Sequence, residues 1–69
     1  MSEIDQLVKM ANQIADNFAF HEDAAARVAD HIQRFWAPSM RQKLREQAVA
    51  GDERIKPQVK QALERLEAP

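Results

Sequence analysis

Apolar residues in the first part of the chain recur at steps of three and four positions. They are Ile4, Leu7, Val8, Ala11, Ile14, Ala15 and Phe18. This spacing gathers apolar side chains on one helical face, which predicts an amphipathic helix over residues 3–19. Ser2 stands at the N-cap position and Asp5 follows three residues later, which is a variant of the capping box.

The same periodicity resumes after a break at residues 20–23. The apolar positions are Ala25, Val28, Ala29, Ile32, Phe35 and Trp36. The acidic pair Glu22 and Asp23 suits a first helical turn, and Pro38 disfavours helical backbone at the residue before it. We therefore expect a second helix over residues 22–36.

Two shorter helices are predicted in the C-terminal half. Pro38 fits a first helical turn, and apolar residues follow at positions 40, 44 and 48. Gly51, the single glycine, stands where a left-handed residue commonly ends a helix. Pro57 opens a last segment with apolar residues at 59, 62, 63 and 66. These patterns predict helices over residues 38–50 and 57–67.

The four segments predict one all-α domain over residues 1–69, a small bundle of three to four short helices. The first two helices have wide apolar faces and should form a helical hairpin, with two shorter C-terminal helices added to it. Leu44 and Val49 supply almost all the aliphatic side chains of residues 41–54. We therefore expect the C-terminal half to pack loosely, or to pack on another protein.

Composition agrees with a helical chain and narrows the chemistry. The 69 residues are 45% hydrophobic, with many alanines and one glycine, a balance typical of helical proteins. The absence of cysteine excludes disulfides, thiolate metal ligands and cysteine catalysis by this chain. No apolar run approaches the roughly 20 residues of a membrane span, and the acidic start is unlike a signal peptide. We expect no membrane contact and a cytoplasmic location.

Catalysis and metal binding have no recognisable motif. His21 and His31 are ten residues apart, and neither belongs to a pair with the spacing of metal ligands. The carboxylates fall on predicted helix exteriors or caps, and no glycine-rich phosphate loop is present. We therefore expect this chain not to be an enzyme, with no catalytic, cofactor-binding or metal residues.

Charge is uneven along the chain, although the net charge is −1. Residues 1–23 are mainly acidic, whereas residues 27–45 are mainly basic. A net charge of −1 argues against nucleic-acid binding, and the apolar connection before Pro38 lacks the glycine-containing turn of a helix-turn-helix. The basic band at residues 34–45 nevertheless leaves one alternative, a free-standing helical regulator or DNA-binding module. Self-association of the bundle is a third possibility.

Side chains favoured at protein interfaces surround the bend at Pro38. Phe35 and Trp36 lie about 100° apart on one helix, so both rings cannot enter one narrow core. One ring fills the core, and the other is available to a partner. Asn12 and Gln13 flank the apolar face of the first helix, as solvated residues or as partner contacts. The candidate partner-contact residues are Asn12, Gln13, Arg34, Phe35, Trp36, Met40 and Arg41.

Two segments carry a resemblance to a known family. MANQIA at residues 10–15 and VADHIQRFWAPSMR at residues 28–41 resemble the delta subunit of bacterial NAD-dependent, molybdenum-containing formate dehydrogenases. The resemblance extends over about residues 4–66. The chain departs from it at Ala37, where the family usually has an acid, and at Lys56, where Ser or Asp is common. Both departures remove a helix cap worth about 1 kcal/mol.

The resemblance implies a non-catalytic accessory subunit of a cytoplasmic enzyme that oxidises formate and reduces NAD⁺. The implied partner is the large alpha subunit, within an alpha-beta-gamma-delta complex, and the implied role is assembly or stabilisation. Molybdopterin, iron–sulfur clusters and FMN are expected in the partner subunits, and no cofactor is expected in this chain. No nucleic acid and no membrane are implied as partners.

Overall fold

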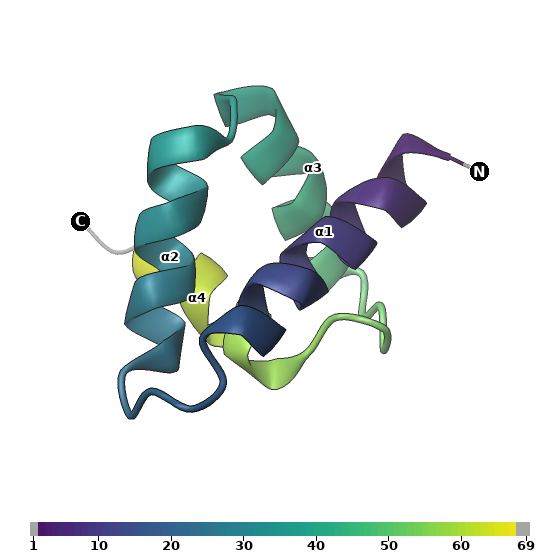
Figure 1. Cartoon of the computed structure of the whole chain (residues 1–69). Helices are drawn as coiled ribbons and strands as arrows, with labels where there is room; N and C mark the ends of the chain where they lie inside the picture. Colours follow the sequence, from purple (N-terminus) through teal and green to yellow (C-terminus); the bar gives the residue numbers. More distant parts are fainter. Residues whose placement is uncertain (1, 68–69) are drawn as a thin grey trace.

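The computed structural model describes residues 2–67, in which four α-helices follow one another (Figure 1). The helices are α1 (Glu3–Asn17), α2 (Ala24–Phe35), α3 (Pro38–Val49) and α4 (Pro57–Glu67). No strand occurs in this part of the chain. The all-α prediction is therefore confirmed.

The connection between α1 and α2 is longer than predicted. The backbone N–H groups of Phe18, His21 and Ala24 each donate to the carbonyl three residues earlier, so residues 18–23 form successive turns. Asp23 occupies the N-cap of α2, but its carboxylate accepts from Arg27 Nε at 2.8 Å instead of capping the helix. Helix α1 ends two residues before its predicted end at residue 19, and α2 begins two residues after its predicted start at residue 22.

The predicted caps of α1 and α3 are present. Ser2 Oγ accepts from the Asp5 N–H at 3.2 Å, and the Ser2 N–H donates to the Asp5 carboxylate at 3.3 Å, which completes the capping box. Pro38 begins α3, and Ala37 before it provides no side-chain cap. Gly51 has φ +87°; its own N–H donates to the Ala48 carbonyl and the Asp52 N–H donates to the Gln47 carbonyl, which is a Schellman motif.

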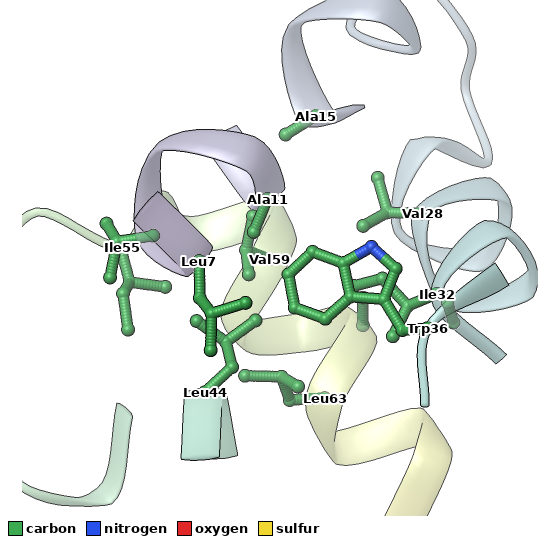
Figure 2. Close-up of a cluster of buried hydrophobic side chains, with 13 residues drawn as sticks. Leu7, Ala11, Ala15, Val28, Ile32, Trp36, Leu44, Ile55, Val59 and Leu63 are labelled. Atoms are coloured by element: carbon green, nitrogen blue, oxygen red, sulfur yellow. The ribbon is translucent and has the colours of Figure 1, made fainter. Parts of the chain in front are cut away.

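The core draws on all four helices and on the connection before α4 (Figure 2). Ile32, Leu44, Val28 and Val59 are the largest fully buried side chains. Ile55, Ala62 and Leu63 are also buried. The expectation of a loosely packed C-terminal half is therefore wrong for α4. Its short alanine and valine side chains let the helix backbones approach closely, so a narrow apolar face is enough to bury it.

Helix α2 has its most extensive contact with α4. The two N-terminal helices also touch, as predicted, but less extensively. Helix α3 packs mainly against α1 and only sparsely against α2 and α4. One side of α3 therefore faces a weakly packed seam along α2 and α4.

Candidate protein-binding surfaces

The two adjacent aromatic rings before Pro38 diverge, as the helical spacing predicted. Trp36 is 6% exposed and belongs to the core, where Figure 2 shows its indole among side chains of α1, α2 and α4. Phe35 is 71% exposed. Of the two candidate rings, the structure thus leaves Phe35 accessible to a partner and encloses Trp36.

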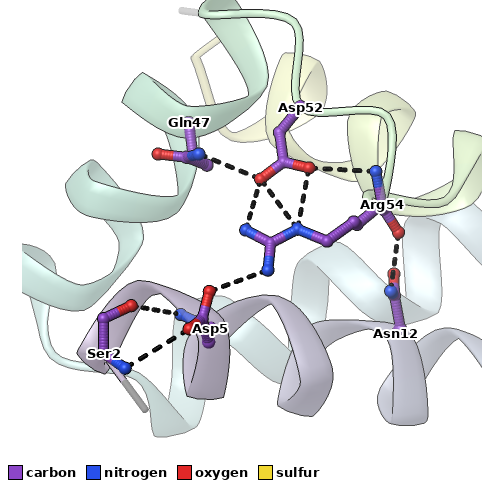
Figure 3. Close-up of polar contacts among 6 residues, drawn as sticks. All are labelled: Ser2, Asp5, Asn12, Gln47, Asp52 and Arg54. Carbon is purple, nitrogen blue, oxygen red and sulfur yellow. Dashed lines mark hydrogen bonds and ion pairs between the residues drawn. The ribbon is translucent and has the colours of Figure 1, made fainter.

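Asn12 joins α1 to the connection between α3 and α4. Its Nδ2 donates to the Arg54 carbonyl at 2.8 Å (Figure 3), and its Oδ1 accepts from the Lys56 N–H at 3.1 Å. Both ends of the amide are therefore used within the chain, although Asn12 was predicted as a partner contact. Its neighbour Gln13 is exposed.

An ion cluster fastens the same connection to α1. Arg54 donates to the Asp52 carboxylate from Nη2 at 2.7 Å and from Nε at 3.0 Å, and its Nη1 donates to Asp5 at 2.7 Å (Figure 3). Gln47 donates to Asp52 at 2.9 Å. Hydrogen bonds from Arg54 hold the pKa values of Asp52 and Asp5 below the usual range, and they raise the pKa of Arg54. Sequence reasoning missed this cluster because Asp5 and Arg54 are 49 positions apart.

An aromatic strip, composed of Phe18, His31 and Phe35, lies along α2. The His31 ring centroid is 4.8 Å from that of Phe35 and 6.3 Å from that of Phe18. Two ion pairs of α2 residues lie beside a shallow hollow that these rings line, Arg27–Asp23 at 2.8 Å and Arg34–Asp30 at 3.1 Å. The predicted contact residue Arg34 is thus paired with Asp30, and charged side chains line the hollow together with the rings.

A second surface follows the weakly packed seam beside α3. We call it the α3–α4 groove; it is lined principally by Arg41, Arg45, Val49, Lys60, Leu63 and Leu66. Two hollows of about 170 and 250 Å³ lie next to each other, since Arg45 and Leu63 line both. Of the predicted contact residues, Arg41 belongs to this groove, and Met40 is half-buried against the core.

The predicted partner-contact residues therefore do not form one patch. Trp36 and Met40 belong to or pack against the core, and Asn12 supports a connection. Phe35 belongs to the aromatic strip, Arg34 lies beside it, and Arg41 lines the groove. Two side chains of α4 were not predicted to line a surface: Leu66 was predicted only as part of the apolar face of its helix, and Lys60 was not singled out. Their position opposite α3 depends on the tertiary fold, which the helical spacing does not report.

The basic band at residues 34–45 is partly neutralised within the chain. Arg34 pairs with Asp30, and Lys43 pairs with Glu3 of α1 at 2.9 Å. Counterion release from DNA requires cations that are available to phosphates. These two ion pairs weigh against the alternative of a DNA-binding module.

Neither a metal cluster nor a bilayer-spanning helix is found in residues 2–67. No three His, Cys, Asp or Glu residues of this part come together in a way that could hold an ion. None of its helices combines the length and the hydropathy that crossing a membrane requires. A hollow of about 710 Å³ is open to solvent between the α1–α2 connection and α4.

Comparison with known protein families shows the family to which this chain belongs. The family model for the NADH-dependent formate dehydrogenase delta subunit, FdsD, matches residues 6–63, which include most of every helix. The chain belongs to this delta subunit family. The resemblance drawn from the MANQIA and VADHIQRFWAPSMR segments is thereby confirmed. No curated protein and no solved structure matches the chain significantly.

Membership of the family describes an accessory subunit of formate dehydrogenase. A subunit of that kind works in a complex with other chains. The aromatic strip and the α3–α4 groove are therefore considered as surfaces for contact with another protein.

Proposed function

We propose that this chain is a non-catalytic accessory subunit that binds the large alpha subunit of a cytoplasmic, NAD-dependent formate dehydrogenase. It acts within an alpha-beta-gamma-delta complex and promotes assembly or stability. The family match over residues 6–63 carries this proposal. The exposed ring of Phe35 adds support, because aromatic side chains are enriched at protein interfaces.

The proposed mechanism is thermodynamic linkage. A chain that binds only the folded, cofactor-loaded alpha subunit shifts the equilibrium towards that state. At a free concentration 100-fold above the Kd, such binding contributes about 2.7 kcal/mol to the stability of the partner. In this proposal molybdopterin, iron–sulfur clusters and FMN are bound by the partner subunits, since this chain has no cysteine to ligate a cluster.

Affinity purification from native cells tests the proposal. A tagged full-length chain is expected to recover a molybdenum-containing subunit, and the eluate is expected to reduce NAD⁺ with formate. Deletion of the gene is expected to lower the amount of assembled enzyme per cell. Recovery of the chain without any formate dehydrogenase subunit, while the complex assembles normally in the deletion strain, contradicts the proposal.

A further inference from the structure

The α3–α4 groove is an opening in the packing of the bundle. Helix α3 is held mainly by α1, and its contacts with α2 and α4 are sparse. The groove lies on that sparsely packed side, with Arg41 and Arg45 on α3 opposite Leu63 and Leu66 on α4. Two neighbouring hollows between helices can receive successive side chains of an extended or helical segment of another protein.

Apolar side chains remain uncovered along the α3–α4 groove. Val49, at the end of α3, is 82% exposed. Leu66 is half-buried, and Leu63 lies beneath it as part of the core. The hollows of about 170 and 250 Å³ are smaller than typical cofactor pockets, and they suit the entry of individual side chains.

The charge of the groove is mainly positive. Among the described lining residues, Arg41 and Lys60 are cations and Glu64 has a carboxylate, while Arg45 already makes an interaction within the structure. Within residues 2–67, neither Arg41 nor Lys60 has a carboxylate oxygen within 4 Å; the hydrogen bond of Arg41 goes to the neutral Gln33 carbonyl at 3.3 Å. Most cations outside the groove are ion-paired within the chain, namely Arg27, Arg34, Lys43, Arg54 and Lys56.

We propose that the α3–α4 groove binds an acidic, amphipathic segment of the alpha subunit. This inference rests on the proposed function and adds the surface and the chemistry of its partner segment. Apolar side chains of the segment pack on Val49 and Leu66, and its carboxylates pair with Arg41 and Lys60. Charge complementarity of this kind accelerates association and selects the partner. The aromatic strip does not define an occupant in the same way, because its flanking charges are paired with each other.

Two variants of the full-length chain test the groove without disturbing the core. Lys60→Glu reverses a charge that has no carboxylate partner in the described residues, and Val49→Asp alters a side chain that is 82% exposed. Arg65→Glu is the matched control, because it makes the same charge change on α4 but lies at the solvent-open hollow on another side. Circular dichroism verifies that all variants keep the helical content of the parent.

Binding is measured by titrating each chain onto formate dehydrogenase purified from cells that lack the delta gene. Lys60→Glu and Val49→Asp are each expected to weaken binding by about tenfold or more, whereas Arg65→Glu is expected to leave it within about twofold. Added salt is expected to weaken binding of the unaltered chain to the enzyme. The affinity of Lys60→Glu is expected to depend less steeply on salt.

The outcomes separate the groove from the proposed function. If the parent binds and both groove variants match it, the groove inference is overturned while the proposed function stands. If Lys60→Glu binds more tightly, the partner surface is basic and the inference is wrong. If the chain dimerises alone and Val49→Asp abolishes dimerisation, the occupant is a second copy, which also overturns it. If the parent does not bind the enzyme, both proposals fail.

Discussion

Phe35 and Trp36 are neighbours in sequence, but their rings lie in opposite environments. Trp36 is 6% exposed and Phe35 is 71% exposed. Phe35 is the last residue of α2, whereas Trp36 follows it with extended backbone (φ −96°, ψ 138°), so the two side chains leave the chain in different directions. The sequence predicted this divergence but could not assign the rings, since the assignment depends on where α4 and α1 lie.

Alanine substitution of Trp36 is expected to affect mainly the stability of the fold, whereas alanine substitution of Phe35 is expected to affect mainly binding to the partner. Trp36→Ala leaves a cavity in the core and should lower the free energy of unfolding by about 3–5 kcal/mol. Phe35→Ala should change it by about 0.5 kcal/mol or less and still weaken binding to the alpha subunit. Urea denaturation and a binding titration measure the two effects. Equal losses of stability in both variants would contradict the assignment of Phe35 to the surface.

Asn12 and Gln13 are a similar pair of neighbours. Asn12→Ala removes the partner of the Arg54 carbonyl and of the Lys56 N–H. We expect it to lower the free energy of unfolding by about 1–3 kcal/mol, because two hydrogen bonds are lost and their backbone groups are left to water. Gln13→Ala is the control and should change stability by about 0.5 kcal/mol or less. Equal unfolding midpoints for these variants would contradict a structural role for Asn12.

The connection between α3 and α4 is the element that differs most from the expectation of a loose C-terminal half. It buries Ile55 and is fastened to α1 by Asn12 and by the cluster of Asp5, Asp52 and Arg54. Proline at 57 and glycine at 51 marked its ends in the sequence. The fastening itself could not be predicted, because its partners are separated by more than 40 positions and only the fold brings them together.

This cluster makes stability depend on acidity. The pKa values of Asp5 and Asp52 are lowered in the folded state, so near pH 4 the unfolded chain binds protons that the folded chain does not. Their contribution is therefore present above about pH 4 and is lost as the pH falls further. Urea midpoints measured between pH 7 and pH 3 should decrease on acidification, and less steeply for Arg54→Met. Identical pH profiles for parent and variant would show that the cluster contributes nothing to stability.

The whole molecule is a closed bundle on the side of α2 and α4 and an open one beside α3. Periodicity, Pro38 and the Gly51 cap were enough to predict the helices and the all-α class. They did not predict that α2 packs chiefly against α4, because helix pairing depends on three-dimensional fit that one helix cannot report. Alanine counts little in a hydrophobicity pattern, yet Ala62 of α4 is fully buried. The α3–α4 groove lies on the open side, and neither the groove nor the position of Lys60 in it was predicted from the sequence.

The proposed role requires that this chain bind the alpha subunit. The decisive experiment is calorimetric titration of the isolated, cofactor-loaded alpha subunit with the full-length chain. Saturable binding is expected, together with a higher unfolding temperature of the alpha subunit when the chain is present. Absence of binding heat with an unchanged unfolding temperature would contradict it.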